Sequence, residues 1–226
     1  MKRLLNLCLA ALAGLAAASC NFEDVYTISN MDDIVTVKGE YLVSDYGTTY
    51  HITEDKTTSK DWKKDDTRLY AVFDVLNRQL DISLKEVRPL QIVEAAPLTV
   101  LEEDPKDPVV VALQNVSGGY INLALQIYMK KATECPHDIS FQYRKAPDGN
   151  EVEVYVFHEG NNENPTLLAE DDLEKEIRFY SIPLESIQAS DNEVLILNLD
   201  VLVQDTDGKY YVKRTSYQLV RSSSRY

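Results

Sequence analysis

Cysteine, glycine and proline are all sparse in this sequence of 226 residues, with three, eight and eight copies. So few glycines and prolines exclude a collagen-like repeat and a low-complexity chain. Apolar residues account for 44% of the chain and charged residues for 27%, proportions that are typical of globular proteins. We therefore expect one large folded domain or two small ones.

Positive charge is also in short supply. The 23 lysines and arginines are outnumbered by 37 aspartates and glutamates, so the formal net charge is -14. Binding to nucleic acid depends on clustered lysines and arginines, which displace the counterions of the phosphates. The charge therefore argues against nucleic acid as a partner.

The N-terminus carries the longest apolar run. Lys2 and Arg3 precede residues 4–18, which are apolar except for Asn6 and too few to span a bilayer comfortably. Small residues at 17–19 then lead into Cys20. This pattern resembles the lipobox of bacterial lipoproteins, which implies cleavage before Cys20 and acylation of its sulfur. An ordinary secretory signal is the alternative, because Ala17 stands where lipoboxes prefer leucine.

We therefore assign residues 1–19 to a lipoprotein signal peptide and residue 20 to lipidation. More than one acyl chain anchors a protein stably, so the expected membrane partner is reached through the lipid on Cys20. The expected location is the cell envelope of a Gram-negative bacterium, at the outer membrane. Cys8 leaves with the leader, so Cys135 is the sole remaining free thiol and no intramolecular disulfide forms.

The mature chain begins with an acidic tether, residues 20–33, followed by β patterns throughout. Residues 34–53 read as a hairpin around Gly47, and residues 68–76 place alternate apolar side chains on one face, as a strand requires. Residues 80–87 pair with that strand through a three-residue link. Four or five strands in about sixty residues predict a small OB-type barrel over residues 34–96.

A second all-β unit is expected over residues 97–226. Three prolines and several acids at 95–108 interrupt the strand pattern and suggest a domain junction. Six or seven short strands with turns between them predict a β-sandwich. The predicted strands are 121–129, 137–145, 151–157, 176–182, 194–203 and 209–219, and the one weak helical pattern is 167–177.

This arrangement resembles the NigD-like lipoproteins. The resemblance covers essentially the whole chain and rests on the lipobox, the acidic tether and strand runs such as VTVKGEYLVSDYGTTYHI, INLALQIYM and DTDGKYYVKRTSYQL. It implies an N-terminal OB domain, a C-terminal β-sandwich and a cell-envelope location. The family takes its name from a bacteriocin gene cluster and has no established activity, so the resemblance implies a fold and no mechanism.

Catalytic motifs are not evident. The best local cluster is Glu134-Cys135-Pro136-His137-Asp138, whose thiol and imidazole could form a reactive thiolate or bind a soft metal. A turn before a strand explains the same residues more simply, because adjacent residues rarely converge on one metal. The segment 205–208 resembles the start of a calcium loop but lacks the glutamate of an EF-hand, so a hairpin turn is expected. We therefore predict no catalytic residue, no metal site and no cofactor.

Binding is the more plausible activity. The chain has 14 tyrosines, and four aromatic side chains fall in the first unit, where OB barrels bind ligands: Tyr41, Tyr46, Tyr50 and Trp62. Tyrosine also suits a half-buried strand, so the same residues could serve packing. The expected function is a non-enzymatic lipoprotein that binds a protein or a neutral glycan. The alternatives are a hydrolase that uses Cys135 and His137 and, more weakly, a bacteriocin-associated or immunity-type lipoprotein.

Overall fold

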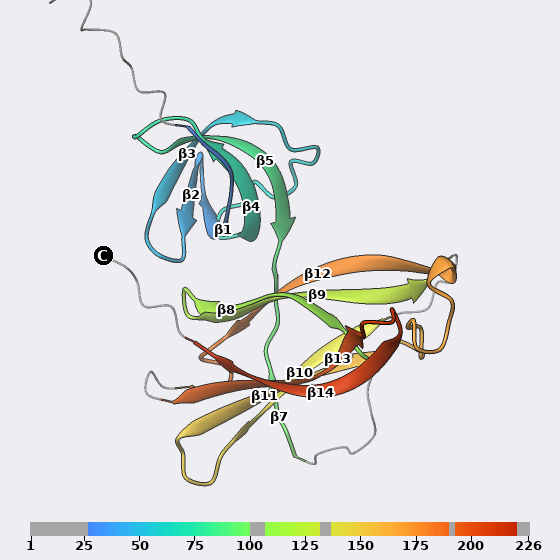
Figure 1. The fold of residues 1–226 in the computed structure, drawn as a ribbon. Helices are drawn as coiled ribbons and strands as arrows, with labels where there is room; N and C mark the ends of the chain where they lie inside the picture. The colour runs from blue at the N-terminus through green and yellow to red at the C-terminus, as the bar shows by residue number, and fades with distance from the viewer. Residues whose placement is uncertain (1–26, 100–106, 132–136, 190–192, 221–226) are drawn as a thin grey trace, which may run out of the picture.

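The computed structural model describes residues 27–99, 107–131, 137–189 and 193–220, and it is built from strands. The predicted all-β fold is confirmed: a small barrel stands on one sheet of a β-sandwich (Figure 1). Within the described residues, no helix has the length and apolarity needed to cross a bilayer. Cys20 lies outside these residues.

The barrel is closed by five strands in the order β1-β2-β3-β5-β4. The pairing of β3 with β5 is parallel, whereas the other pairs are antiparallel. This is the OB-type barrel that the sequence predicted. Its strands are β1 (Ile28–Lys38), β2 (Tyr41–Ser44), β3 (Thr49–Asp55), β4 (Arg68–Val75) and β5 (Asp81–Pro89).

Alternation along β4 builds the barrel core. Leu69, Ala71, Phe73 and Val75 are all buried, as the two-residue period predicts, and Arg68 and Tyr70 point out of the barrel toward the sandwich. Phe73 has no exposed surface and packs against the ring of Tyr50, with centroids 4.7 Å apart. The side chains on the outer face of β4 are therefore the ones available to the second domain.

The sandwich consists of a five-stranded sheet, β14-β13-β11-β10-β7, and a four-stranded sheet, β6-β12-β9-β8. One continuous cluster of buried apolar side chains fills the space between the two sheets. The strands are β6 (Gln91–Ile92), β7 (Ala96–Pro97), β8 (Val110–Ser117), β9 (Tyr120–Lys130), β10 (Asp138–Lys145), β11 (Glu151–Glu159), β12 (Leu173–Pro183), β13 (Val194–Gln204) and β14 (Tyr210–Leu219).

The domain boundaries differ from the predicted ones. Strand β1 begins at Ile28, so the last six residues of the predicted tether belong to the barrel. The chain leaves the barrel at Pro89 and adds β6 to one sandwich sheet and β7 to the other. The domain junction therefore lies near residue 90, ahead of the predicted 95–108, because residues 91–92 and 96–97 already pair with strands of the sandwich.

The weak helical pattern at 167–177 forms only a 3-10 turn, η1 (Glu170–Asp172). From Leu173 onward the chain is strand β12, which pairs with β9 over eleven residues. Pairing along a whole neighbouring strand outweighs a local helical preference.

The segment 205–208 forms the predicted turn between β13 and β14, closed by a hydrogen bond from the Asp205 amide to the Lys209 carbonyl.

Candidate functional site

A buried ion pair lies at the contact between the two domains. The guanidinium of Arg68, at the start of β4, donates two parallel hydrogen bonds to the carboxylate of Asp45, each 2.8 Å long. The side chains of Arg68 and Asp45 are only 5% and 3% exposed. Because burying a charge is costly unless it is paired and hydrogen-bonded, the surroundings of this pair must supply further partners.

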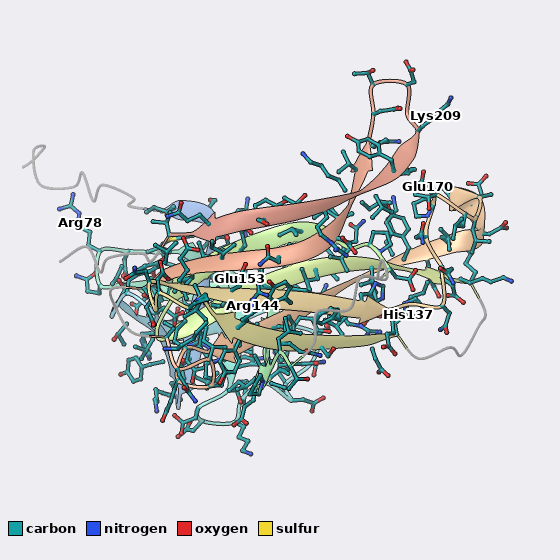
Figure 2. The ribbon with its side chains drawn as sticks, turned by 90° about the horizontal axis from the view of Figure 1, so that it is seen from below. Arg78, His137, Arg144, Glu153, Glu170 and Lys209 are labelled. Carbon is teal, nitrogen blue, oxygen red and sulfur yellow. The ribbon has the colours of Figure 1, made fainter. Side chains whose placement is uncertain are left out.

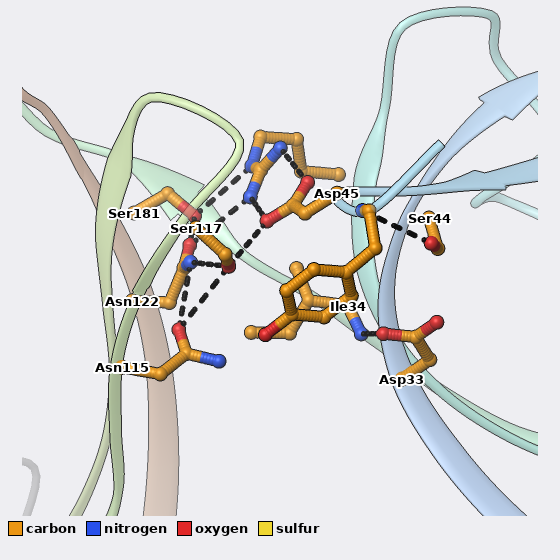
Figure 3. Close-up of polar contacts among 10 residues, drawn as sticks. Asp33, Ile34, Ser44, Asp45, Asn115, Ser117, Asn122 and Ser181 are labelled. Carbon is orange, nitrogen blue, oxygen red and sulfur yellow. Dashed lines mark hydrogen bonds and ion pairs between the residues drawn. The ribbon is translucent and has the colours of Figure 1, made fainter. Parts of the chain in front are cut away.

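The sandwich supplies those partners (Figure 3). Arg68 Nε donates to Ser181 Oγ at 3.2 Å, and its Nη2 donates to Asn122 Oδ1 at 3.1 Å. Ser117 Oγ donates to the Asp45 carboxylate at 2.7 Å. The ring of Tyr120 lies 4.0 Å from the guanidinium carbon, a cation–π contact. We call this set the interdomain lock: Asp45, Arg68, Ser117, Tyr120, Asn122 and Ser181.

A second acid lies in the barrel wall beside the lock. Burial raises the pKa of Asp33 to about 6, although hydrogen bonds from the Ile34 amide and the Tyr50 hydroxyl favour its charged form. Burial likewise raises the pKa of Tyr50 to about 12, and the neighbouring Asp33 charge adds to that shift. This barrel wall disfavours additional negative charge, which makes it an unsuitable site for an anion.

A groove of about 560 Å³ runs along the domain contact beside the lock. We call it the interdomain groove. The ring of Tyr70 stacks on Phe179 of β12, with centroids 5.4 Å apart and planes at 24°. Ile177 is 48% exposed on the sheet face below the barrel. The groove is lined by Tyr70, Glu86, Arg88, Ala112, Leu113, Ala124, Lys175, Glu176, Ile177 and Phe179.

The charged side chains of the groove neutralise one another or their neighbours. Arg88 pairs with Glu86 at 2.7 Å, and Lys175 pairs with Glu170 at 2.8 Å. Glu176 accepts from Arg178 at 3.0 Å. The groove therefore offers an apolar and aromatic surface with balanced polar groups along it, and its volume is in the range of small-ligand sites.

Two of the four predicted ligand-binding side chains belong to the barrel core. Tyr50 and Trp62 are each 3% exposed. Trp62 Nε1 donates to Thr57 Oγ1 at 3.1 Å and to the Ser59 carbonyl at 3.0 Å, so its polar atom is also satisfied internally. The binding role predicted for Tyr50 and Trp62 does not fit this placement, because an external ligand cannot stack on a ring enclosed by the barrel.

The other two predicted residues remain at the surface. Tyr41 and Tyr46 are 46% and 40% exposed, and Tyr41 packs against the ring of His51 with centroids 5.1 Å apart. Sequence reasoning missed Tyr70 and Phe179. Tyr70 stands at an outward position of β4, whose burial alternates, and that is the signal that could have identified it, whereas burial along β12 does not alternate around Phe179.

Two histidines that are distant in the sequence lie side by side in the structure. His137 Nδ1 lies 3.1 Å from His158 Nε2, and His137 Nε2 lies 3.2 Å from Glu163 Oε2. His51 lies elsewhere and pairs with Asp81 at 2.9 Å. Cys135, the other half of the predicted cluster, is outside the described residues. Among the described residues, no group of three or more histidines, cysteines or acids could hold a metal ion.

Comparison with solved structures gives matches over most of the chain. A NigD-like immunity protein from Bacteroides caccae matches with a TM-score of 0.56 and 17% identity, over 84% of this chain and 98% of that one. A protein of unknown function from Bacteroides vulgatus has a TM-score of 0.53 and 15% identity, over 84% of this chain and 92% of that one. A candidate lipoprotein from Bacteroides fragilis has a TM-score of 0.52 and 13% identity, over 87% and 100%.

No family model matches the chain, and no curated protein matches it by sequence. The similarity is therefore one of fold. It extends over both domains of the described structure and almost the full length of each solved chain. The chain has the two-domain fold of the NigD-like immunity protein, as its resemblance to that family implied.

Proposed function

We propose that this protein is a non-enzymatic, lipid-anchored protein of the bacterial cell envelope that binds a neutral glycan in the interdomain groove. The observation that carries the proposal is the groove itself, in which Tyr70 and Phe179 meet across the domain contact. The interdomain lock holds both walls in place, so the groove is formed before any ligand arrives. A preformed site avoids the entropic cost of ordering loops on binding.

The chemistry of the groove favours a neutral sugar over a charged ligand. The apolar lining, which includes the exposed side chain of Ile177, suits the C–H faces of a sugar ring. The paired carboxylates and the guanidinium of Arg88 can accept from and donate to hydroxyl groups. A chain with a net charge of -14 repels anions, and the balanced charges of the groove do not reverse that repulsion.

Binding can be tested by calorimetry of the full chain in detergent against neutral oligosaccharides of glucose, galactose, mannose and xylose. We expect saturable binding of at least one sugar. Phe179→Ala should weaken it at least tenfold, because loss of an aromatic contact costs about 1.5 kcal/mol or more. Tyr211→Ala is the matched control, since Tyr211 is 46% exposed on β14 and does not line the groove.

Three results would count against this site. The first is the absence of binding to any sugar of the panel, and the second is equal affinity of the Phe179→Ala and Tyr211→Ala proteins. The third is a loss of affinity in Tyr41→Ala with Phe179→Ala unaffected, which would move the site to the barrel face that the sequence first suggested.

The lipid anchor is tested separately. Cys20→Ser should shift the protein from the membrane fraction to the soluble fraction, because without acyl chains the chain has no anchor of sufficient affinity. Fractionation with immunodetection measures this, and Cys135→Ser is the control that leaves fractionation unchanged. Retention of the Cys20→Ser protein in membranes would contradict the anchor. Proteinase treatment of whole cells then distinguishes a surface location at the outer membrane from a periplasmic one.

The two alternative functions have weaker support. A hydrolase built on Cys135 and His137 needs an accessible imidazole, yet the His137 side chain is fully buried with both ring nitrogens engaged. An immunity-type role is favoured by one observation, the fold shared with a NigD-like immunity protein. Deleting the gene and finding unchanged sensitivity to bacteriocins would remove that role.

A further inference from the structure

A chain of three titratable side chains lies buried at one end of the sandwich. His137, directly before β10, contacts His158 of β11 and Glu163 of the loop 160–168. Their side chains are almost wholly enclosed: that of His137 has no exposed surface, His158 is 3% exposed and Glu163 is 9% exposed. His137 lies toward the same end of the molecule as Glu170 (Figure 2). This cluster plays no part in the groove.

The arrangement of the two rings is that of a hydrogen bond. The ring centroids are 5.3 Å apart while the facing nitrogens are 3.1 Å apart, so the rings point at each other nearly head-on. Two imidazoles that share a tetrahedral metal instead direct their lone pairs to a common point beside the line between them. The geometry therefore favours a shared proton over a shared metal ion.

A neutral protonation pattern satisfies both contacts of the His137 ring. His137 Nε2–H donates to Glu163, which leaves His137 Nδ1 as an acceptor for Nε2–H of His158. The Nδ1 atom of His158 is buried without a hydrogen bond of good geometry, and the ring faces the backbone carbonyls of Asp107 and Pro108. Both rings are neutral in this pattern. A further proton on His158 would have to enter a site enclosed by protein, 3.1 Å from a second imidazole.

The cluster connects both sheets of the sandwich. Glu163 also accepts from the backbone amide of Lys130, at the end of β9, with a distance of 2.6 Å. The guanidinium of Arg178, on β12, donates to the His137 carbonyl at 2.5 Å. His137 and His158 belong to the side of the opposite sheet. The loop 160–168 is thus held to the ends of β9 and β11 through Glu163 and the two rings.

The backbone is shaped to admit this contact. A Cβ atom on Gly160 would lie 2.8 Å from His158 Nε2 and 2.9 Å from His137 Nδ1, so only glycine leaves room for the paired rings. Asp107 fixes the turn from outside, because its carboxylate accepts from the amides of Gly160 at 2.7 Å and Asn162 at 3.1 Å. The close approach of the histidines is therefore built into the loop.

We propose that His137, His158 and Glu163 form a proton-controlled latch, which holds the loop 160–168 at neutral pH and releases it in mild acid. Uptake of a proton by His158 removes the neutral ring pair and places positive charge in the closed end of the sandwich. Release of the loop exposes the His158 ring to water and lets it accept a proton. The latch is independent of the proposed glycan site.

The charges around His158 set the pH range of release. Burial and, to a smaller extent, the neighbouring His137 ring lower the pKa of His158 to about 4. The Asp107 carboxylate and the carbonyls of Asp107 and Pro108 oppose this shift without overcoming it. The amide of Lys130 and the ring of His137 hold the pKa of Glu163 below its usual value, so Glu163 stays charged.

The direction of the pH effect follows from these values. The released state binds a proton at His158 with the ordinary pKa of 6.5, whereas the latched state binds one only near pH 4. The released state therefore takes up more protons between pH 6.5 and 4, and acid favours it. A lowered histidine pKa thus gives a latch that is fully closed above pH 6.5 and weakens as the pH falls toward 4.

Hydrogen exchange on the full chain in detergent tests the latch. From pH 7.5 to pH 5, we expect the protection factor of the Lys130 amide to fall about 30-fold, as a shift in pKa from 6.5 to 4 requires. The amide of Leu69 in the barrel should keep its protection. In His158→Gln the Lys130 amide should lose less than threefold, because glutamine keeps a donor toward His137 and does not titrate.

A second measurement does not depend on the variant folding. The Cε1–H resonance of His158 in the wild-type protein should titrate with a midpoint below pH 5, and His51 serves as an internal control on the barrel. A midpoint near 6.5 for His158 would overturn the latch. So would unchanged protection of Lys130 in the wild-type protein, or an equal loss in the wild-type and His158→Gln proteins.

Discussion

Arg68→Ala is expected to lower the free energy of unfolding by about 3–5 kcal/mol, the usual cost of removing one partner of a buried ion pair. The Asp45 carboxylate, 3% exposed, would keep the Ser117 hydroxyl as a donor and lose both bonds from the guanidinium. Ser181 and Asn122 would each lose the bond from Arg68 as well. Urea unfolding followed by circular dichroism measures the change.

The same variant should uncouple the two domains. Within the lock, Arg68 and Asp45 each bond to both domains, and Arg68 bonds to two sandwich side chains, so its loss removes the main polar tie between them. We expect the barrel and sandwich to unfold in separate transitions, which Trp62 fluorescence resolves because that residue lies in the barrel core. The double variant Asp45→Asn, Arg68→Met should be less destabilised than Arg68→Ala, since it buries no unpaired charge. A loss below about 1 kcal/mol in Arg68→Ala would show that water replaces the guanidinium.

Gly118→Ala is expected to cost about 3 kcal/mol, the second largest effect. Gly118 has a φ of +57°, a left-handed conformation that costs an L-residue about 1–2 kcal/mol. An added Cβ would also lie 2.8 Å from Oδ2 of Asp45 and closer still to its Cγ and Oδ1. Asp45 cannot move aside without breaking its ion pair with Arg68, so the methyl group displaces the interdomain lock.

Gly39→Ala separates the two contributions. Gly39 has a similar φ of +61°, and nothing lies within 4 Å of the position its Cβ would take. Thermal or urea unfolding should therefore show only the conformational cost for Gly39→Ala. Combining Gly118→Ala with Asp45→Ala should remove the steric part of its cost, because the two side chains no longer collide. Equal losses for the two glycine variants would contradict the collision.

Much of the strand architecture could be predicted from the local alternation of apolar and polar residues. The alternation of Leu69, Ala71, Phe73 and Val75 identified β4 and its inner face, and the same period identified β9 and β11. Burial alternates along β4 and β11, so the fold itself imposes their period of two, whereas β9 is buried on both faces over most of its length. The boundaries were less accurate because residues 28–33, 91–92 and 96–97 form strands only by pairing with distant partners.

The candidate sites could not be predicted from local sequence patterns. Tyr50 and Trp62 were predicted to bind a ligand, yet the closure of the barrel encloses both rings. Phe179 and Tyr70 are 109 positions apart in the sequence, and their stacking depends on how the barrel sits on the β12–β9–β8 sheet. No local pattern reports on a contact of that kind, because it is a property of the domain arrangement.

The sequence by itself determined the all-β class, the two-domain order and the strong acidity of this protein. The strand period, the turn residues and the charge can each be read from short stretches of consecutive residues, without knowledge of the fold. Only the tertiary structure decided which polar side chains meet: Arg68 with Asn122 and Ser181, and His137 with His158 and Glu163. These pairs join distant strands, and they become compatible only when the packed sheets exclude water and leave each buried group to find its partner in the protein.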